Sequence, residues 1–422
     1  MNETICAIAT ATGGALGIIR ISGSQTLEIL SHIFTKDLTT AKPNTIHYGH
    51  IADIDEVLVS IFRAPHSYTG EDSAEISCHG SRYILNKVLE LLVQNGCRLS
   101  HPGEFTQRAY LNGKLDLSQA EAVADLIAST NKATHDIALS QLRGHFSSEL
   151  SLLRDQLLKL TSLLELELDF SDHEDLEFAD RTELLELAQK IDKRITSLAE
   201  TFHTGNALKN GIPVAIIGAP NVGKSTLLNA LVGEERAIVS DIQGTTRDAI
   251  EDTIQLGGIT FRFIDTAGIR HTDDHVERLG IDRSLAAAQR ATIILMMTEP
   301  GVPYPDIPVR QDQTIIRIEN KTETFQAKYN IGLNDLRQRL IAATPKTADT
   351  DIIITNARHY EALTHAHDSL LRVIDGLHQQ QSGDLLSEDL RLTLNHLADI
   401  TGGQITPQET LNNIFSHFCV GK

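Results

Sequence analysis

The stretch "PVAIIGAPNVGKSTLLNAL", residues 213–231, decides how the middle of the chain folds. Its first residues are apolar, which predicts a strand, and its last residues carry apolar side chains at the spacing typical of a helix. Between them lies the pattern Gly-x-x-x-x-Gly-Lys-Ser, from Gly218 to Ser225. Glycines at such a junction let backbone N–H groups close around phosphate oxygens at the positive end of the helix. The stretch therefore predicts a P-loop in an α/β domain.

The side chains of this loop indicate a nucleoside triphosphate and metal ions. Lys224 is expected to reach the β- and γ-phosphates, and Ser225 is expected to bind Mg²⁺. The side-chain oxygen of Asn221 could hold a monovalent cation, which would do the work of an arginine finger. The alternative is a glycine turn before a structural helix, but that interpretation leaves the next two motifs unexplained. The expected nucleotide contacts are Asn221, Val222, Gly223, Lys224, Ser225 and Thr226.

Two downstream motifs complete the expected phosphate site. The segment "SDIQGTTRD", residues 240–248, contains Thr245 and Thr246, and Thr246 is placed to bind Mg²⁺ when a γ-phosphate is present. In "FRFIDTAGIR", residues 261–270, a predicted strand ends at a carboxylate that can hold the Mg²⁺ shell. A glycine after it can offer its N–H to the γ-phosphate. The expected contacts in this motif are Asp265, Thr266, Ala267 and Gly268.

The residue that orients the attacking water is not obvious. Ile269 stands where many GTPases have a glutamine, and isoleucine cannot orient water. Glu277, in "DDHVERLG", lies shortly after this motif and could orient the water directly or through a second water. The alternative for Glu277 is a solvated helix carboxylate.

Composition limits the class of protein. The chain has 422 residues, enough for two or three domains, and its net charge is -19. Bulk attraction to nucleic acid is therefore not expected, and any RNA contact must use a local basic patch. The apolar runs are too short to span a bilayer, and we find no secretory signal. Four cysteines without close sequence pairing or zinc spacing favour a cytoplasmic location.

Four zones follow one another along the chain. Short strand-like runs and one helix pattern, "YILNKVLELLVQNG", predict a small α+β domain over 1–116. Helix patterns over 117–207 include leucines at positions 150, 153, 157, 160 and 164. Strand–loop–helix alternation predicts an α/β domain over 208–345, and helix patterns return over 346–422. The fold class predicted is therefore multidomain, α+β and α/β, with the α/β unit inserted into a helical domain.

The segment "IENKTET", residues 318–324, nearly matches the Asn-Lys-x-Asp signature with which GTPases read guanine. It follows the predicted strand "TIIRI", so Asn320, Lys321 and Glu323 stand where a guanine reader belongs. A glutamate replaces the expected aspartate, and its longer stem would fit only if the loop retreats. The alternative is an ordinary polar turn between a strand and a loop.

With these motifs, the chain resembles the MnmE (TrmE) family of tRNA-modification GTPases. Family-like blocks cover nearly all of it in family order, including "GALGIIRISG", "HSYTGEDSAEISCHG", "HPGEFTQRAYLNGKLDLSQAEAVADLI" and the terminal "FCVGK". The P-loop and the two motifs after it are shared with other GTPases. The N-terminal blocks and the cysteine tail single out this family.

The resemblance implies a folate-binding and dimerising N-terminal domain, a helical domain and an inserted P-loop G domain. It implies a K⁺-dependent, Mg²⁺-dependent GTPase that works with an FAD-dependent partner of the MnmG (GidA) type, as a homodimer and as a heterotetramer with that partner. Together they add an aminomethyl-type (carboxymethylaminomethyl) group at position 5 of the tRNA wobble uridine. A 5-formyl- or methylene-tetrahydrofolate supplies the one-carbon unit.

Arg20, Glu75 and Lys114 match the folate contacts of the family, and Cys419 matches its tail cysteine near the folate. Two cations suit the glutamate tail of a folate, and a carboxylate suits the amino-pyrimidine edge of its pterin. From the residues alone, each of the three is an ordinary surface ion-pair member, and Cys419 is a small apolar residue near a terminus. A role of Cys419 in the modification chemistry is a hypothesis.

In the G domain, Glu277 matches the water-orienting glutamate of the family and Asn221 matches its K⁺ ligand. Arg247 and Arg270 match its switch arginines. The resemblance thus implies Glu277 and Arg270 as catalytic residues of the GTPase reaction.

The chain departs from the family after "DTAG". The segment "TEPGVPYPDIPVRQDQ", residues 298–313, is rich in proline where a longer helix is expected. The Ser-Ala loop that supports guanine is expected to be deleted, with "KYNIGLNDLRQRL" running almost straight into a helix. We therefore expect weakened GTP affinity and looser guanine selection. Two alternatives remain: a folate- and tRNA-binding scaffold with a degenerate G domain, and a ribosome-assembly GTPase, which leaves the N-terminal blocks unexplained.

Overall fold

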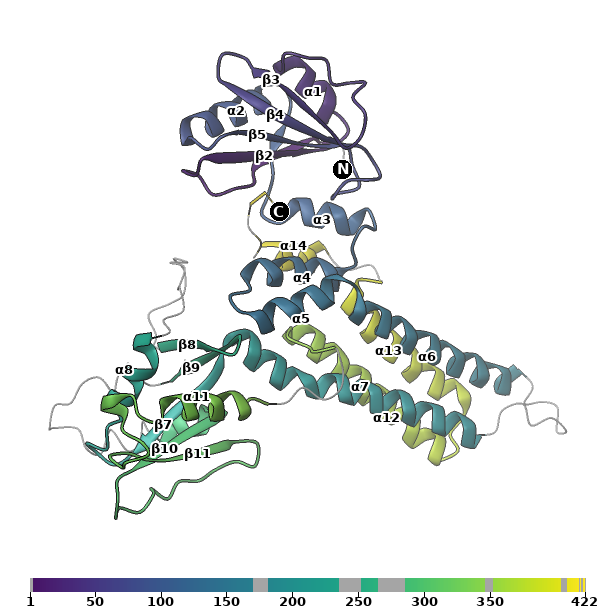
Figure 1. Cartoon of the computed structure of the whole chain (residues 1–422). Helices are drawn as coiled ribbons and strands as arrows, with labels where there is room; N and C mark the ends of the chain where they lie inside the picture. Colours follow the sequence, from purple (N-terminus) through teal and green to yellow (C-terminus); the bar gives the residue numbers. More distant parts are fainter. Residues whose placement is uncertain are drawn as a thin grey trace. The chain divides into compact units, whose positions relative to one another are not determined.

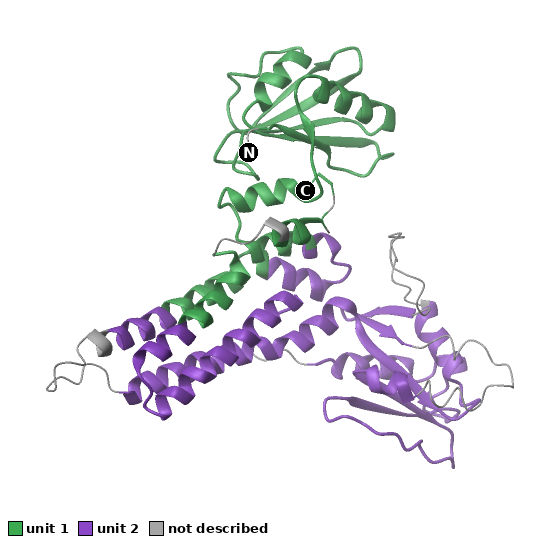
Figure 2. Ribbon diagram, turned by 180° about the vertical axis from the view of Figure 1, so that it is seen from behind, with its two compact units in different colours: residues 1–124, 141–155, 391–422 green, residues 125–140, 156–390 purple. Residues whose placement is uncertain are grey.

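The computed structural model describes residues 3–169, 181–234, 252–264, 285–345, 352–403, 408–416, 418 and 420–421 (Figure 1). The chain divides into two compact units (Figure 2). Unit 1 comprises residues 1–124, 141–155 and 391–422, and unit 2 comprises residues 125–140 and 156–390.

Unit 1 begins with a six-stranded sheet in the order β3-β4-β5-β2-β1-β6. All neighbouring strands are antiparallel except β1 and β6, which are parallel. The strands are β1 (Ile5–Ile8), β2 (Leu16–Ser22), β3 (Thr45–Ile51), β4 (Asp55–Phe62), β5 (Ser73–His79) and β6 (Arg98–Leu99).

Helices α1 (Thr26–Ile33) and α2 (Arg82–Gln94) cover one face of this sheet, and their apolar side chains share one buried cluster with alternate strand residues. Cys6 of β1 belongs to that cluster, whereas Ile5 and Ala7 pack against Phe105 of α3 (Glu104–Leu111). Strand β1 is therefore buried on both faces. The predicted α+β class is confirmed, but the sequence did not predict α1 or β3, because α1 spans only two turns and β3 exposes much of its length.

The predicted helical zones are present. Their helices are α4 (Leu117–Ala128), α5 (Lys132–Leu142), α6 (His145–Asp169), α7 (Arg181–Asn210), α12 (Ala357–His378), α13 (Gly383–Thr401) and α14 (Gln408–Ser416). The five leucines of the predicted stripe in α6 are buried, which confirms the amphipathic pattern. In unit 2, α7 and α12 lie along each other (Figure 1), and Phe202 stacks on Tyr360 with ring centroids 4.6 Å apart.

Unit 2 contains the second sheet, whose strand order is β11-β10-β7-β9-β8. Its strands are β7 (Ile212–Gly218), β8 (Asp252–Leu256), β9 (Ile259–Phe263), β10 (Ile293–Thr298) and β11 (Thr314–Glu319). Only the β8–β9 pair is antiparallel. Helices α8 (Lys224–Glu234) and α11 (Leu333–Ala342) pack on one face, and alanines of residues 285–291 pack on the other. A mostly parallel sheet buried on both faces is the architecture that the P-loop stretch predicts.

Strand β11 forms one edge of this sheet, in the half of the domain that the sequence predicts to be shortened. Strand β10, between β11 and β7, is buried along its whole length, whereas β11 alternates buried and exposed residues at the edge of the sheet. Between β10 and β11, residues 299–313 contain no helix or strand, in agreement with their proline-rich sequence. Tyr304 from this segment lies under the Arg317 guanidinium of β11, 5.8 Å from the ring centroid.

The chain enters and leaves this sheet domain at neighbouring points. Helix α7 leads into β7 through Gly211, and residues 352–355 return beside α7, where Ile354 N–H donates to Thr201 Oγ1 at 3.0 Å. A Cβ on Gly205 of α7 would lie 2.1 Å from the Ile354 carbonyl oxygen, so only glycine permits this approach. An α/β domain whose ends meet in this way fits an insertion into a helical domain.

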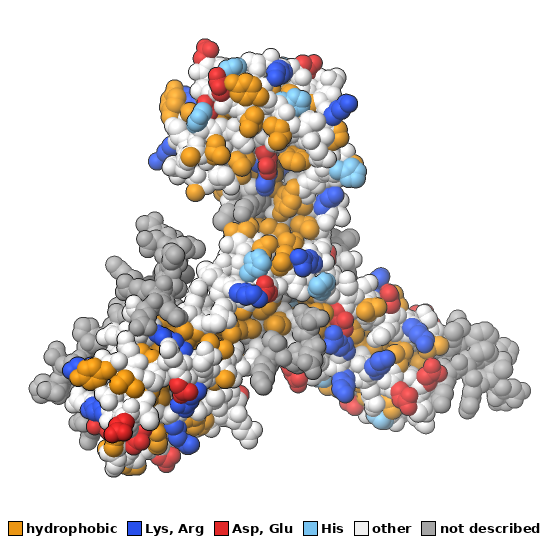
Figure 3. Space-filling view, in the orientation of Figure 1, with side chains coloured by type: hydrophobic (Ala, Val, Ile, Leu, Met, Phe, Trp, Pro, Cys, Tyr) orange, Lys and Arg blue, Asp and Glu red, His pale blue; other side chains and the backbone are white. Residues whose placement is uncertain are grey.

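The described surface is mixed in charge. Lys and Arg side chains lie among Asp and Glu side chains on the face that Figure 3 shows, so the side chains drawn there form no continuous basic surface. No helix within the described ranges is long and apolar enough to cross a membrane.

Candidate nucleotide and folate sites

The P-loop joins β7 to α8, and its glycines are required by close packing. Gly223 has a φ of 98°, and a Cβ on it would lie 2.5 Å from Asn320 Nδ2. A Cβ on Gly218 would lie 2.6 Å from the Met297 carbonyl oxygen of β10. A larger residue at either position would therefore displace the neighbouring backbone or the asparagine that braces the loop.

Lys224 folds back over the loop that carries it. Its Nζ donates to the carbonyl oxygens of Gly218 and Ala219, both at 2.8 Å. Burial lowers the pKa of its ammonium. An ammonium has three donors, so two bonds to loop carbonyls leave a third N–H for an anion at the first turn of α8.

Val222 contributes to the P-loop structure through its backbone carbonyl. Its side chain is buried in the apolar cluster beneath α8, so it cannot touch a nucleotide. Its carbonyl oxygen accepts a bond of 2.8 Å from Asn320 Nδ2. Asn221, beside it, is exposed and has a φ of 62°, a left-handed conformation that asparagine tolerates.

Asn320 ties three segments together. Besides its bond to the P-loop, its N–H donates to the Thr298 carbonyl at the end of β10, at 2.8 Å. Its Oδ1 accepts from Ala327 N–H at 3.1 Å. With 5% of its surface exposed, Asn320 is a buried polar residue with its bonds satisfied. Strand β11 thus delivers this residue to the carboxyl edge of the sheet, next to the phosphate loop, as the sequence position predicted.

The rest of the "NKTE" segment turns toward solvent. Lys321 has a φ of 63°, and its Nζ lies 2.5 Å from Glu299 Oε1 and 3.5 Å from the Asn221 carbonyl oxygen. Thr322 closes a turn with Phe325 through bonds at 3.0 and 3.1 Å. Glu323 is exposed at the tip of this turn.

A short turn separates this segment from α11. The stretch expected to run almost straight into a helix, residues 328–340, does so after one short turn: Gln326 bridges Ile331 around a 3-10 turn, η1 (Ala327–Tyr329), and α11 begins at Leu333. Ala327 is 1% exposed and donates its N–H to Asn320. Gly332, at a φ of 79°, ends the turn, and a Cβ there would lie 2.6 Å from the Phe325 ring. A short loop therefore closes behind Asn320 at Gln326 and Ala327.

Several predicted residues lie outside the described part of the chain. They are Thr245, Thr246, Arg247, Asp265, Thr266, Ala267, Gly268, Ile269, Arg270, Glu277 and Cys419. Their roles remain predictions.

In unit 1, Arg20 and Glu75 stand directly opposite each other on β2 and β5. Arg20 donates through Nε and Nη2 to Glu75 Oε1, at 3.0 and 2.8 Å, and through Nη1 to the Gly421 carbonyl at 3.1 Å. Both bonds to the carboxylate use Oε1, so Oε2 remains the candidate contact for a ligand. Lys114 is exposed, and its Nζ donates to the Pro65 carbonyl at 3.0 Å.

A buried ion network that sequence analysis missed lies beside this pair. Arg108, 2% exposed, donates to Glu71 Oε2 and to Glu104 Oε1, each at 3.0 Å. Arg98 donates to the same Glu104 carboxylate at 2.6 and 3.0 Å. The available signal was the i,i+4 spacing of Glu104 and Arg108, which places both side chains on one face if the segment is helical.

Comparison with known proteins covers the whole chain. The model of the MnmE helical domain matches residues 117–419, and the model of the GTP-binding protein TrmE N-terminus matches residues 4–114. The tRNA modification GTPase MnmE of Bacteroides fragilis is 52% identical, with 100% of both chains covered. Its counterpart from Phocaeicola vulgatus is 51% identical, covering 100% of this chain and 99% of that protein. The counterpart from Porphyromonas gingivalis is 46% identical, covering 100% and 98%.

The alignment with the Bacteroides fragilis protein spans 465 positions, more than the 422 residues of this chain. The relative therefore has residues without a counterpart here. This difference agrees with a chain that has lost a segment.

Proposed function

The chain belongs to the MnmE family of tRNA modification GTPases, and on that premise we propose that it hydrolyses GTP to drive modification of the tRNA wobble uridine. An FAD-dependent partner of the MnmG type acts with it, and the product carries a carboxymethylaminomethyl-type group at position 5. The observation that carries the proposal is the phosphate loop braced by Asn320 at 2.8 Å, in a chain that resembles such GTPases from end to end.

The residues of the P-loop fit a nucleotide with Mg²⁺ and K⁺. Within the described ranges, Lys224 donates to loop carbonyls, and it can exchange them for phosphate oxygens. Ser225 would hold Mg²⁺ with Thr246 and Asp265, and Asn221 would hold K⁺, which supplies positive charge beside the phosphates when bound. Glu277 would orient the catalytic water, and Arg270 is the second proposed catalytic residue. The other proposed nucleotide contacts are the residues that the three phosphate-site motifs predict.

Guanine recognition is proposed for the loop around Asn320. Lys321 lies against the P-loop, and the Ala327 turn closes behind Asn320. Glu323 is the candidate carboxylate for the guanine edge. These contacts favour an active GTPase rather than a scaffold with a degenerate G domain. Asn320, which connects the proposed guanine-binding loop to the phosphate loop, has its hydrogen bonds intact.

A folate site is proposed at Arg20, Glu75 and Lys114. The Arg20 guanidinium lies 5.6 Å from the Tyr68 ring centroid and 5.7 Å from that of Phe105, so a cation and aromatic faces meet here. Arg20 also donates to the Gly421 carbonyl of the C-terminal tail. A role of Cys419 in the modification chemistry is part of this proposal. A bound tetrahydrofolate would supply the one-carbon unit.

A homodimer is proposed through the N-terminal domain. Ile46 and Tyr48 of β3 and Leu58 of β4 are 67%, 54% and 46% exposed, and Tyr48 stands opposite Leu58. Such neighbouring apolar side chains suit a protein partner. We further propose a heterotetramer with the flavoprotein, a cytoplasmic location, and the predicted domains over 1–116, 117–207, 208–345 and 346–422.

The test of the proposed function is GTP turnover in KCl and in NaCl, with and without the flavoprotein. We expect turnover at least about tenfold faster in KCl, because a cation of the right size completes the charge beside the phosphates. Asn221→Ala should bring the KCl rate down to the NaCl rate. Equal rates in both salts would contradict K⁺ dependence, and no turnover in either would favour the scaffold.

Shortening the carboxylate at position 323 is expected to improve guanine selection. Glu323→Asp places the carboxylate at the length that the guanine signature uses, and a recovered buried pair is worth about 1–3 kcal/mol. The ratio of GTP to ATP affinity should therefore rise about tenfold, as measured by nucleotide titration. Glu319→Asp, the same change on β11, is the matched control. An unchanged ratio for Glu323→Asp would show that this side chain does not reach the base.

A further inference from the structure

The turn between α4 and α5 is bonded to the β8–β9 hairpin of the sheet domain. Asn131 Nδ2 donates to Thr260 Oγ1 at 2.8 Å, and Gln255 Nε2 donates to the Thr130 carbonyl at 2.7 Å. Ala133 N–H donates to the Gly258 carbonyl at 3.1 Å. Both strands of the hairpin and its tip thus contact the turn. We call this contact the joint: Thr130, Asn131 and Ala133 with Gln255, Gly258 and Thr260.

The joint is packed as well as hydrogen-bonded. Ala133 and Ile137 of α5 lie against the apolar core of the second sheet. Gly258 has a φ of 79°, and a Cβ on it would lie 3.0 Å from Lys132 Cβ. The hairpin tip therefore sits directly on the first turn of α5, and a movement of one requires a movement of the other.

Asn131 belongs to both sides of the joint. Its Oδ1 accepts from Thr134 N–H at 2.9 Å and caps α5, while its Nδ2 holds the hairpin. One side chain thus bonds both the hairpin and the start of the helix.

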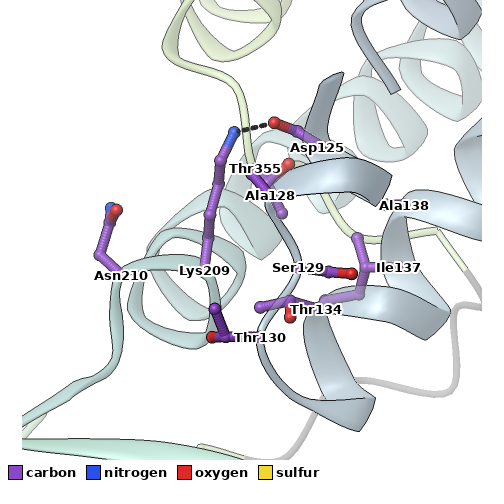
Figure 4. A pocket seen from close by; sticks show the side chains of 10 residues that line it. All are labelled: Asp125, Ala128, Ser129, Thr130, Thr134, Ile137, Ala138, Lys209, Asn210 and Thr355. Carbon is purple, nitrogen blue, oxygen red and sulfur yellow. Dashed lines mark hydrogen bonds and ion pairs between the residues drawn. The ribbon is translucent and has the colours of Figure 1, made fainter. Parts of the chain in front are cut away.

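The helical side of the joint is not solidly filled. A cavity of about 200 Å³ lies beside the turn, between α4, α5 and the end of α7 (Figure 4). Lys209 Nζ and Asp125 Oδ1 meet at its rim, 2.7 Å apart. The cavity is lined by residues on the entering and returning segments, such as Asn210 and Thr355. The turn can therefore shift on this side without compressing a packed core.

In the sequence, the β8–β9 hairpin of the joint lies between two motifs of the expected phosphate site. Strand β8 begins shortly after Thr246, and β9 ends just before Asp265, the two motif residues expected to sense the γ-phosphate. Each motif is therefore joined to one strand of the hairpin by a short stretch of chain. The hairpin in turn has three bonds to the α4–α5 turn.

We propose that the joint transmits the nucleotide state of the G domain to the helical domain, with Asn131 as its positioning residue. The inference rests on the proposed GTPase function and adds the route of coupling to it. The joint connects a strand pair of the G domain with the start of a helix of the helical domain. A conformational change in either domain can therefore shift the position of the other.

The experiment is hydrogen exchange of the full chain, with GDP and with a non-hydrolysable GTP analogue, over peptides that cover 129–138. We expect exchange in the first turn of α5 to differ about fivefold or more between the two nucleotides, the lower end of typical coupling. In the double variant Asn131→Ser and Gln255→Ala, the difference should fall below about twofold, because each lost bond removes part of the coupling. Serine keeps the helix cap but cannot reach Thr260.

Lys132→Ala is the matched control, since it keeps the Cβ beside Gly258 and loses only an exposed ion pair with Asp136. It should retain the wild-type response. GTP turnover of the double variant, measured on the same samples, should stay within about twofold of wild type, because the changes lie outside the phosphate site. Equal exchange of the wild-type turn with both nucleotides would overturn the proposed coupling through the joint, and so would a double variant that keeps the full response. Neither outcome would contradict the proposed GTPase function. A wild-type protein that binds neither nucleotide would overturn both.

Discussion

Lys224→Ala is expected to lower kcat/KM for GTP at least about a hundredfold, the usual loss when one preorganised charge at a phosphate is removed. Lys224 follows the last glycine of the loop and begins α8, so its ammonium and the helix N-terminus act on the same phosphates. Alanine keeps the helix start but supplies no charge. Steady-state GTP turnover in KCl measures the loss.

The fold should survive this change. The bonds of the Lys224 ammonium go to carbonyls of its own loop, so alanine leaves the apolar core beneath α8 untouched. The thermal unfolding curve without nucleotide should therefore match wild type. Lys190→Ala, an exposed lysine of α7, controls for the loss of a positive charge. Turnover within tenfold of wild type for Lys224→Ala would mean that this loop is not where GTP is hydrolysed.

The phosphate loop could be predicted because its signal is contiguous. Strand, glycines and helix lie within one stretch, and each follows from local rules of backbone conformation and apolar spacing. The bracing role of Asn320 could be placed only by analogy, since its partner Val222 is distant in sequence. The pairing of Arg20 with Glu75 depends on the register between β2 and β5, which no local pattern specifies.

The turn behind Asn320 was missed for a related reason. Asn330 and Gly332 both have positive φ, which marks turn chemistry just before α11. The apolar spacing of α11 dominates this stretch, so its sequence indicates only the approach to a helix. The turn is stabilised by the bond from Ala327 to Asn320, a contact that exists only after β11 has joined the sheet. The joint was equally hidden, because its bonds connect segments far apart in the chain.

The largest effect on stability is expected from Arg108→Met, which keeps the volume of the side chain but removes its charge. Arg108 is 2% exposed and pairs with Glu71 and Glu104, so methionine leaves two carboxylates without this partner. Breaking a buried pair from one side costs about 3–5 kcal/mol. Hydrogen exchange of β1 and β2 amides in the full chain measures this loss locally, without a two-state assumption for the whole protein.

The pH dependence of this network follows from Glu104. Its burial acts to raise its pKa, but bonds from Arg98, the His101 N–H and Arg108 outweigh burial and lower the pKa to about 2. A folded-state pKa below the ordinary value of 4.5 means that the carboxylate stabilises the fold above that pH. This stabilisation should be lost as the pH falls from 4.5 toward 2, and Arg108→Met should weaken the dependence.

Lys87→Ala provides the contrast within the same domain. It removes an ion pair with Glu90 whose side chains are 44% and 57% exposed, so exchange of the β1 and β2 amides should not change. If Arg108→Met were as mild as Lys87→Ala, the carboxylates of Glu71 and Glu104 would have found other partners, and the network would not determine the stability of the N-terminal sheet. A large loss confined to Arg108→Met would instead show that this buried guanidinium holds α3 to the segments before β1 and β5, through its bonds to Glu104, the Glu3 carbonyl and Glu71.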